Sequence, residues 1–214
     1  MTNQPDGYLA IPESGSGPGV LVLHAWWGLN DTFKTVADRL AEAGFVAFAA
    51  DLAEGQVAKT IEEAEKVGGS VDERYETVRS SVGDIAQWLV NHDATTGDKV
   101  GILAFSLGAY FGLFASNARP DLIHSVVTFY GAGSYDFAQS QAAYQGHFAE
   151  NDPYEGENVD DLEQAMKDAG RPVEFFHYPG TGHWFFEPDR PEYNEAAAKL
   201  AWERTLNFLQ ANTQ

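Results

Sequence analysis

The sequence contains no cysteine and few basic residues. Without cysteine, the chain forms no disulfide, builds no thiolate metal site and offers no cysteine nucleophile. Lysine and arginine number 13 against 32 acidic residues, which gives a formal net charge of −19. Because such a negative surface repels phosphate backbones and anionic lipids, we expect neither a nucleic-acid partner nor a membrane partner.

Long apolar stretches are missing as well. The longest apolar run, residues 20–29, is far shorter than the roughly 20 residues that a membrane-spanning helix needs. Residues 1–8 (MTNQPDGY) are polar and lack the basic start and the apolar stretch of a signal peptide. We therefore expect a cytoplasmic protein, and the alternative is the mature form of a secreted one.

Apolar and aromatic residues are abundant, at 44% and 13% of the 214 residues. This composition predicts a well-packed globule, and the length suits one domain over residues 1–214. We expect a monomer or a small homo-oligomer.

Short apolar runs alternate with helical patterns along the chain. Strands are expected at residues 19–28, 45–51, 99–106, 124–131, 144–150 and 173–179. Helices are expected at residues 31–43, 71–91, 107–116, 158–169 and 191–211, and the acidic segment 54–67 has some helical character. Strands that alternate with helices of this length predict an α/β fold with a mostly parallel central sheet and helices on both faces.

A single hydroxyl stands at a corner between a predicted strand and a predicted helix, in the stretch "LAFSLGAYF" (103–111). In parallel sheets, functional groups collect at the carboxyl ends of the strands. Residues 104–108 resemble the G-x-S-x-G nucleophile elbow, with Ala104 keeping the small size that the corner requires. Ser106 is therefore a candidate nucleophile, and the alternative is a serine that only caps the helix.

A carboxylate follows a later strand. Asp152 lies directly after a predicted strand and before Pro153, a place that suits an acid that orients a histidine. Most Asp-Pro pairs only form turns, and this is the alternative. Glu150, inside the predicted strand, and Asp160, at the start of a helix, are the other candidate acids.

His183 follows the last predicted strand, next to an aromatic residue, and is the candidate base. The other histidines are expected to be structural or exposed. His24, at the mouth of the first predicted strand, is expected to brace a loop by hydrogen bonds. The chain order Ser106, Asp152, His183 is the order that α/β-hydrolases use for their triad.

The chain resembles the dienelactone hydrolase family of α/β-hydrolases over nearly its whole length. The matching stretches are "LVLHAWWGLN" (21–30), "FVAFAADL" (45–52), "VGDIAQWL" (82–89), "KVGILAFSLGAYFGLFA" (99–115), "FYGAG" (129–133), "HFAENDPY" (147–154) and "YPGTGHWFFE" (178–187). By position, the resemblance implies that Ser106 is the nucleophile, Asp152 the acid and His183 the base. It also implies an oxyanion hole made by the backbone N–H groups of Leu107 and Trp26.

Three positions depart from the family's pattern. Serine replaces the cysteine nucleophile of the best-known members, and Ala25 replaces the glutamate that helps to generate their thiolate. A serine activated by His183 has no need of that glutamate, so the two changes agree. No arginine matches the one that binds the substrate carboxylate in members that cleave dienelactone, since Arg74 and Arg79 do not align with it. A carboxylated dienelactone is therefore not the expected substrate.

These features predict a serine hydrolase that cleaves a small neutral, apolar or aromatic ester or lactone through an acyl-enzyme. We expect no metal ion and no organic cofactor. The residues expected near the substrate are Ala25, Trp27, Tyr110, Tyr130, Trp184 and Phe185, and at least half of the nearby aromatic residues are expected to belong to the core. The alternatives are a non-catalytic protein of this fold that binds a small molecule, and an acyltransferase or peptidase that uses the same triad.

Overall fold

The central feature of the computed structural model is a seven-stranded sheet. The structure describes residues 3–133, 135–155 and 158–213. The strands are β1 (Gly7–Ala10), β2 (Gly17–Leu23), β3 (Val46–Ala50), β4 (Thr95–Phe105), β5 (Ile123–Phe129), β6 (Ala143–Asn151) and β7 (Val173–Gly182). Their order across the sheet is β1-β3-β2-β4-β5-β6-β7, with β1 antiparallel to β3 and the other neighbouring pairs parallel.

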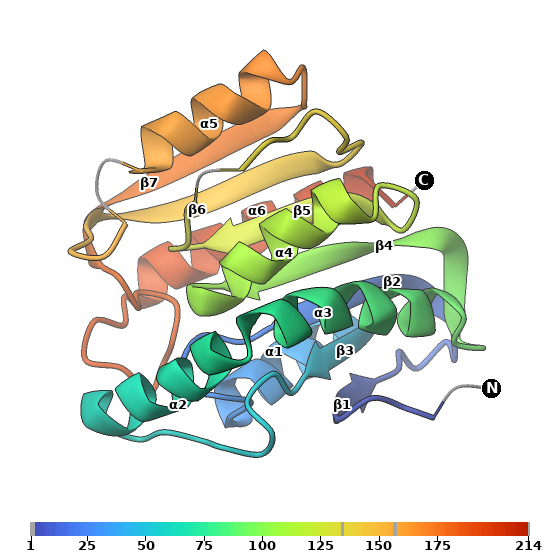
Figure 1. Cartoon of the computed structure of the whole chain (residues 1–214), viewed down its shortest axis with the longest axis horizontal. Coiled ribbons are helices and arrows are strands. Elements are labelled where there is room, and N and C mark those ends of the chain that lie inside the picture. The colour runs from blue at the N-terminus through green and yellow to red at the C-terminus, as the bar shows by residue number, and fades with distance from the viewer. Residues whose placement is uncertain (1–2, 134, 156–157, 214) are drawn as a thin grey trace.

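Helices cover both faces of this sheet. They are α1 (Asp31–Glu42), α2 (Ile61–Glu73), α3 (Tyr75–Val90), α4 (Leu107–Ala118), α5 (Asn158–Asp168) and α6 (Glu195–Ala211). Figure 1 shows α2, α3 and α4 in front of the sheet, α1 and α6 behind it, and α5 beside β7 at one edge. The expected mostly parallel sheet with helices on both faces is confirmed.

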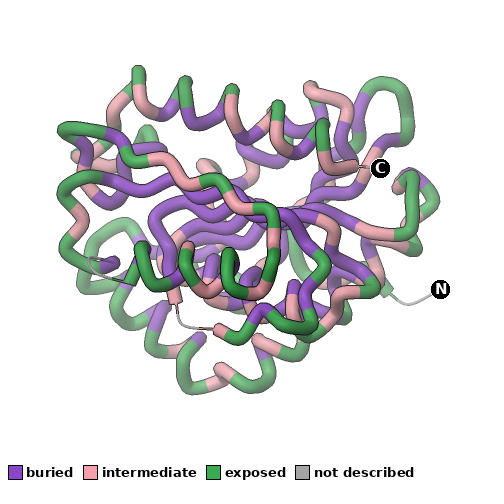
Figure 2. Tube along the Cα trace, turned by 90° about the horizontal axis from the view of Figure 1, so that it is seen from above, coloured by how far each residue is buried: buried purple, intermediate pink, exposed green. Residues whose placement is uncertain are grey.

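The inner strands are buried on both sides. All five residues of β3 are buried, as are residues 19–23 of β2. Continuous apolar runs of this kind are what a sheet covered by helices on both faces requires. Figure 2 shows the buried chain in the middle of the molecule and the exposed residues on the outer turns of the helices. Within the described residues, no helix combines the length and the apolar character needed to cross a membrane.

The strand order creates a place for a site. The chain passes from β2 to β3 on one side of it, and β4 lies on the other side of β2. The connections that leave the carboxyl ends of β2 and β4 diverge there, and such a switch point opens a crevice. The loop after β2 carries Trp26, and the corner between β4 and α4 carries Ser106.

Three elements differ from the sequence predictions. The prediction of a single helix over residues 71–91 is wrong, because the helix breaks at Arg74, between α2 and α3. The edge strand β1 was not expected, because four residues are too few to show a period. The last helix begins at Glu195 rather than at 191, because Asn194 caps it by accepting a hydrogen bond from Ala197 N–H.

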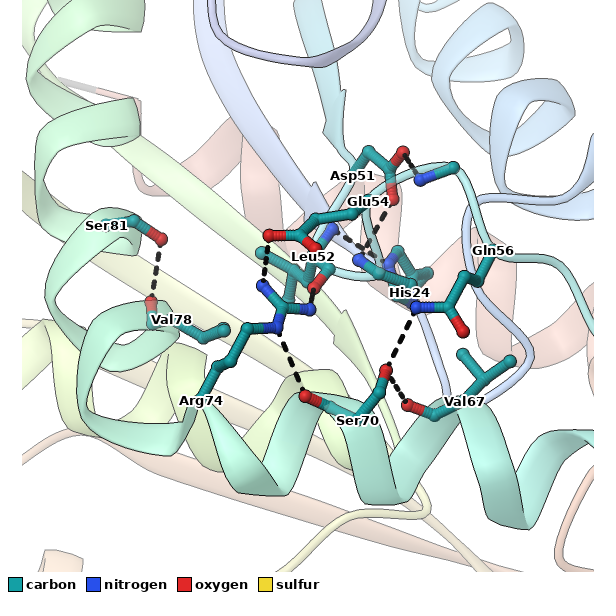
Figure 3. A network of polar contacts seen from close by, with 12 residues as sticks. His24, Asp51, Leu52, Glu54, Gln56, Val67, Ser70, Arg74, Val78 and Ser81 are labelled. Carbon is teal, nitrogen blue, oxygen red and sulfur yellow. Dashed lines mark hydrogen bonds and ion pairs between the residues drawn. The ribbon is translucent and has the colours of Figure 1, made fainter.

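Arg74 holds the junction between α2 and α3 (Figure 3). Its Nε donates to Ser70 O at 3.1 Å, its Nη1 to the Glu54 carboxylate at 2.9 Å, and its Nη2 to Leu52 O at 3.1 Å. These bonds tie the end of α2 to the loop after β3. The position of α2 matters because this helix forms one wall of the cavity described below.

Candidate active site

Ser106 stands at the corner between β4 and α4 in a strained backbone conformation. Its φ of 47° and ψ of −114° lie in a region that residues other than glycine rarely adopt. Its N–H donates to Phe129 O of β5 at 2.9 Å, which holds the corner against the sheet. The Ser106 side chain makes no capping bond to α4, and its Oγ lies 2.9 Å from His183 Nε2. This geometry does not fit the helix-cap alternative.

Two glycines make room for the corner. A Cβ atom on Gly108 would lie 2.6 Å from Leu23 O, and a Cβ atom on Gly131 would lie 2.7 Å from Ser106 O. Ala104, which replaces the first glycine of the usual motif, is fully buried in β4. The corner therefore accommodates alanine at position 104, while Gly108 and Gly131 have no room for a Cβ atom.

His183 joins the serine to a carboxylate. Its Nδ1 lies 2.7 Å from Asp152 Oδ2, while its Nε2 faces Ser106 Oγ. Only 3% of the His183 side chain and 5% of the Asp152 side chain are exposed. The rings of Tyr130 and Tyr154 lie against the imidazole, with centroids at 4.9 and 4.8 Å. The three residues expected to form a triad thus lie in one hydrogen-bonded series, and the imidazole is fixed from both sides.

Asp152 forms a turn and contacts the imidazole at the same time. Its Oδ1 accepts hydrogen bonds from two backbone N–H groups of the following turn, at 2.9 and 3.3 Å, while Oδ2 faces His183. The turn and the acid are therefore not alternatives at this position. The Glu150 carboxylate instead accepts a hydrogen bond from Gly180 N–H at 2.8 Å, and Asp160 lies in the first turn of α5.

His24 ties two loops together, as expected from its place at the mouth of β2. Its Nδ1 donates to Ala25 O at 2.6 Å, and its Nε2 accepts from Leu52 N–H at 3.1 Å. Burial lowers the pKa of His24, so the ring stays neutral with one donor and one acceptor nitrogen. The loop that carries Trp26 is thereby fixed to the loop after β3.

A cavity of about 410 Å³ opens beside Ser106 and His183. Its walls come from the loop after β2, from α2, from the first turn of α4 and from the connections after β6 and β7. The lining residues are Trp26, Glu65, Gly68, Gly69, Asp72, Ser106, Leu107, Tyr110, Tyr154, Glu155, His183 and Trp184. Its volume suits a small organic ligand.

The cavity contains only part of the expected pocket. Of the six candidate residues, Tyr110 and Trp184 line it. The expectation is wrong for four residues that are at most 1% exposed and pack in the core: Ala25, Trp27, Tyr130 and Phe185. The Tyr130 hydroxyl, for example, donates to the buried carboxylate of Glu187 at 2.8 Å. Their proximity in sequence to the site residues does not bring their side chains to the cavity.

Glu155 is a lining residue that the sequence reasoning missed. It is 3% exposed, and its Oε2 accepts a hydrogen bond from Ala132 N–H at 2.8 Å while its Oε1 accepts one from Tyr110 Oη at 3.3 Å. Burial raises the pKa of Glu155 to about 7. No sequence signal distinguishes this carboxylate from the other acidic residues around it. Among the described residues, no group of three or more histidine, aspartate or glutamate side chains is arranged to hold a metal ion.

The two residues expected to supply oxyanion-hole donors both line the cavity with Ser106. Leu107 is the first residue of α4, and the first N–H groups of a helix have no acceptor within the helix. Trp26 lies inside a turn that Gly28 N–H closes by donating to Ala25 O at 3.2 Å. Their role as donors stays a prediction.

The chain matches known proteins over nearly its whole length. The model of the Dienelactone hydrolase family matches residues 6–213. Protein usf of Aquifex pyrophilus is 32% identical over 213 residues, which cover 95% of this chain and 92% of that protein. A Bradyrhizobium sp. protein named as a probable 2-oxo-3-(5-oxofuran-2-ylidene)propanoate lactonase is 33% identical over 221 residues, 95% of this chain and 88% of that protein.

A solved structure shares the fold. A dienelactone hydrolase-like promiscuous phosphotriesterase from metagenomic libraries matches with a TM-score of 0.81 and 23% identity, over 94% of this chain and 88% of that chain. The seven-stranded sheet, the family match and the two relatives agree with one another. The chain therefore belongs to the dienelactone hydrolase family and is a hydrolase of the α/β-hydrolase fold.

Proposed function

We propose that this chain is a serine hydrolase that cleaves small carboxylic esters or lactones. The observation that carries the proposal is the hydrogen-bonded series from Ser106 Oγ through His183 to Asp152, at the wall of a cavity. A serine hydroxyl is a weak nucleophile until a base takes its proton, and the imidazole needs a partner that fixes its tautomer. Family membership and the lactonase relative support esters and lactones as the substrate class.

The first half of the reaction forms an acyl-enzyme. Ser106 Oγ bonds to the carbonyl carbon while its proton moves to His183 Nε2. Negative charge develops on the carbonyl oxygen, where the N–H groups of Leu107 and Trp26 would stabilise it. His183 then gives the proton to the leaving alcohol oxygen as the bond from that oxygen to the acyl carbon breaks. Asp152, bound to Nδ1, stabilises the imidazolium between these two transfers.

The second half repeats the route with water. His183 takes a proton from water while the water oxygen bonds to the acyl carbon. The bond from that carbon to Ser106 Oγ then breaks, and the proton on Nε2 returns to the serine oxygen. A lactone follows the same steps, but its alcohol stays attached to the acyl group. The cycle needs no thiolate, which agrees with alanine at position 25.

Fluorophosphonate labelling tests this proposal. The reagent bonds to activated serines, so we expect one adduct by intact-mass measurement on the wild-type protein and none on Ser106→Ala. The same variant should lose ester hydrolysis by at least about a thousandfold. Ser80→Ala, an exposed hydroxyl on α3, is the matched control and should behave as the wild type.

Four outcomes would count against the proposal. An unmodified Ser106 would favour a protein that only binds a small molecule. Undiminished ester cleavage by Ser106→Ala would show that this serine is not the nucleophile. Labelling together with acyl transfer to an added amine, but without hydrolysis, would favour the acyltransferase alternative. Cleavage of peptides but not of esters would favour the peptidase alternative.

A further inference from the structure

Apart from His183, the acidic and basic side chains that line the cavity are all carboxylates. They belong to Glu65, Asp72 and Glu155, and no lysine or arginine of the described residues lines the cavity. A carboxylate ligand would therefore meet only like charge, because nothing in the lining pairs with it. A cationic group would meet opposite charge from α2 and from the connection after β6.

Two of these carboxylates stand on one face of α2. Glu65 and Asp72 are seven residues apart, which is two helical turns, so both point to the same side. Gly68 and Gly69 lie between them and also line the cavity, and a Cβ atom on Gly69 would meet nothing within 4 Å. Because the glycines carry no side chain, the space between the two carboxylates stays open to a ligand.

Three basic residues on or near α2 are engaged elsewhere. Arg74 bonds to the Glu54 carboxylate and to two backbone carbonyls, as Figure 3 shows. Lys66 pairs with Glu62 at 2.9 Å, and Arg79 pairs with Glu76. Within the described residues, neither Glu65 nor Asp72 forms an ion pair, so their charges are left for a ligand.

The third carboxylate lies deeper, beside the candidate catalytic residues. Glu155 follows the Asp152 turn and is held by Tyr110 Oη and by Ala132 N–H. Among the described residues, the groups that face it are a phenol, a backbone amide and the neighbouring carboxylate of Asp152, and none of them is a basic side chain. A cation in the cavity would favour the ionised form of Glu155, whose pKa burial raises to about 7.

Aromatic rings complete this environment. Trp26 and Trp184 are stacked with centroids 5.9 Å apart, and Tyr154 lies 6.1 Å from the first and 5.6 Å from the second. All three line the cavity. Aromatic faces attract alkylammonium groups, and negative charge nearby adds to that attraction. Both indole nitrogens are buried, and neither N–H has an acceptor within the described residues.

We propose that the cavity selects esters that carry an ammonium group, held by Glu65, Asp72 and Glu155 together with the three aromatic rings. This inference rests on the proposed function, because it names the substrate class of the same site. The ester carbonyl would lie at Ser106 and the ammonium group toward α2. The same charges disfavour anionic esters.

Matched substrates test the preference. Acetylcholine, the acetate ester of choline, and its uncharged isostere, dimethylbutyl acetate, differ only by a positively charged nitrogen in place of the quaternary carbon. We expect kcat/KM to be at least about tenfold higher for the cation. Acetoxybutanoate, which carries a carboxylate, should be cleaved more slowly than either. Equal kcat/KM for the cation and its isostere would overturn the inference while leaving the proposed function intact.

Charge-neutralising variants locate the effect. The double variant Glu65→Gln and Asp72→Asn should lower the ratio of cationic to uncharged kcat/KM several-fold, and Glu155→Gln should lower it further. Glu73→Gln makes the same charge change on α2 at an exposed position outside the cavity, so it should keep the wild-type ratio and rates. An equal fall in the ratio for Glu73→Gln would show a non-local effect and would overturn the assignment.

Binding separates the two proposals if no ester is cleaved. Trp26 and Trp184 line the cavity, so tryptophan fluorescence should report choline binding to Ser106→Ala. Choline should bind more tightly than uncharged dimethylbutanol, and the double variant should reduce the difference. Such binding without any turnover would refute the hydrolase and keep the ammonium site, whereas equal binding of both alcohols would refute the ammonium site.

Discussion

At the scale of single residues, Asp152 uses its two oxygens for different purposes. Oδ1 accepts the turn N–H groups and Oδ2 faces His183 Nδ1. Asparagine keeps the first oxygen but can present an N–H donor to the imidazole, which favours the wrong tautomer. We expect Asp152→Asn to stay folded by circular dichroism and to lower kcat for ester hydrolysis about ten-thousandfold. Glu150→Gln, whose side chain accepts a hydrogen bond from Gly180 N–H of the neighbouring strand, should keep kcat; an equal loss in both variants would contradict the role of Asp152.

Glu187 links stability to pH. It is fully buried, accepts a hydrogen bond from Tyr130 Oη at 2.8 Å, and burial raises its pKa to about 8. The folded-state pKa lies above the unfolded value, so the folded protein favours the protonated form of Glu187. The contribution of this group to the free energy of unfolding is therefore fully present below about pH 4.5 and is lost as pH rises through about 8.

We therefore expect the free energy of unfolding to fall between pH 5 and pH 9, with a slope of up to about 1.4 kcal/mol per pH unit from this group. Urea unfolding at several pH values measures it. Glu187→Gln, which stays uncharged, should flatten the fall, while the exposed Glu203→Gln on α6 should leave it unchanged. A Glu187→Gln profile parallel to that of the wild type would refute the linkage.

The sequence predicted three residues of the candidate site, but it did not predict Glu155. Ser106, Asp152 and His183 each end or follow a strand, and the carboxyl ends of parallel strands meet at one edge, so their proximity was predictable. The inward turn of Glu155 depends on contacts with Ala132 and Tyr110, which are distant in sequence. No local pattern encodes such contacts.

At the scale of elements, the junction between α2 and α3 also depends on contacts between residues that are distant in sequence. Apolar residues continue at helical spacing across it, so periodicity alone predicts one helix over 71–91. The break at Arg74 depends on hydrogen bonds to Glu54 and Leu52, which are 20 and 22 residues away. The alternation of strands and helices, in contrast, is local, and it predicted the parallel sheet correctly.

Removal of the Arg74 guanidinium should loosen α2. Arg74→Ala loses hydrogen bonds to Leu52 O, to Ser70 O and to the Glu54 carboxylate. We expect the α2 amides to lose protection from hydrogen exchange by about 1–2 kcal/mol, while the amides of α4 keep theirs. Lys66→Ala, which removes an exposed ion pair on the same helix, should have little effect. Equal loosening of α2 and α4 would mean that Arg74 stabilises the whole fold.

At the scale of the whole molecule, the net charge of −19 acts with the acidic cavity. A strongly negative protein attracts cationic ligands from a distance and raises their rate of encounter. Dissolved salt screens this field, and the screening length falls from about 30 Å at 0.01 M to about 3 Å at 1 M ionic strength. An uncharged substrate does not respond to the field, so only a cationic ester should show the effect.

We therefore expect kcat/KM for acetylcholine to fall about tenfold between about 0.01 M and about 1 M ionic strength, while kcat/KM for dimethylbutyl acetate stays nearly constant. Steady-state kinetics over a salt series measures both.

The double variant Glu65→Gln and Asp72→Asn should keep part of this salt dependence, because it removes two of the 32 acidic charges and leaves the field of the others. A salt dependence that vanishes entirely in the double variant would locate the attraction in the cavity alone. A fall of the same size for both esters would instead mean that salt acts on the protein rather than on the charge of the substrate.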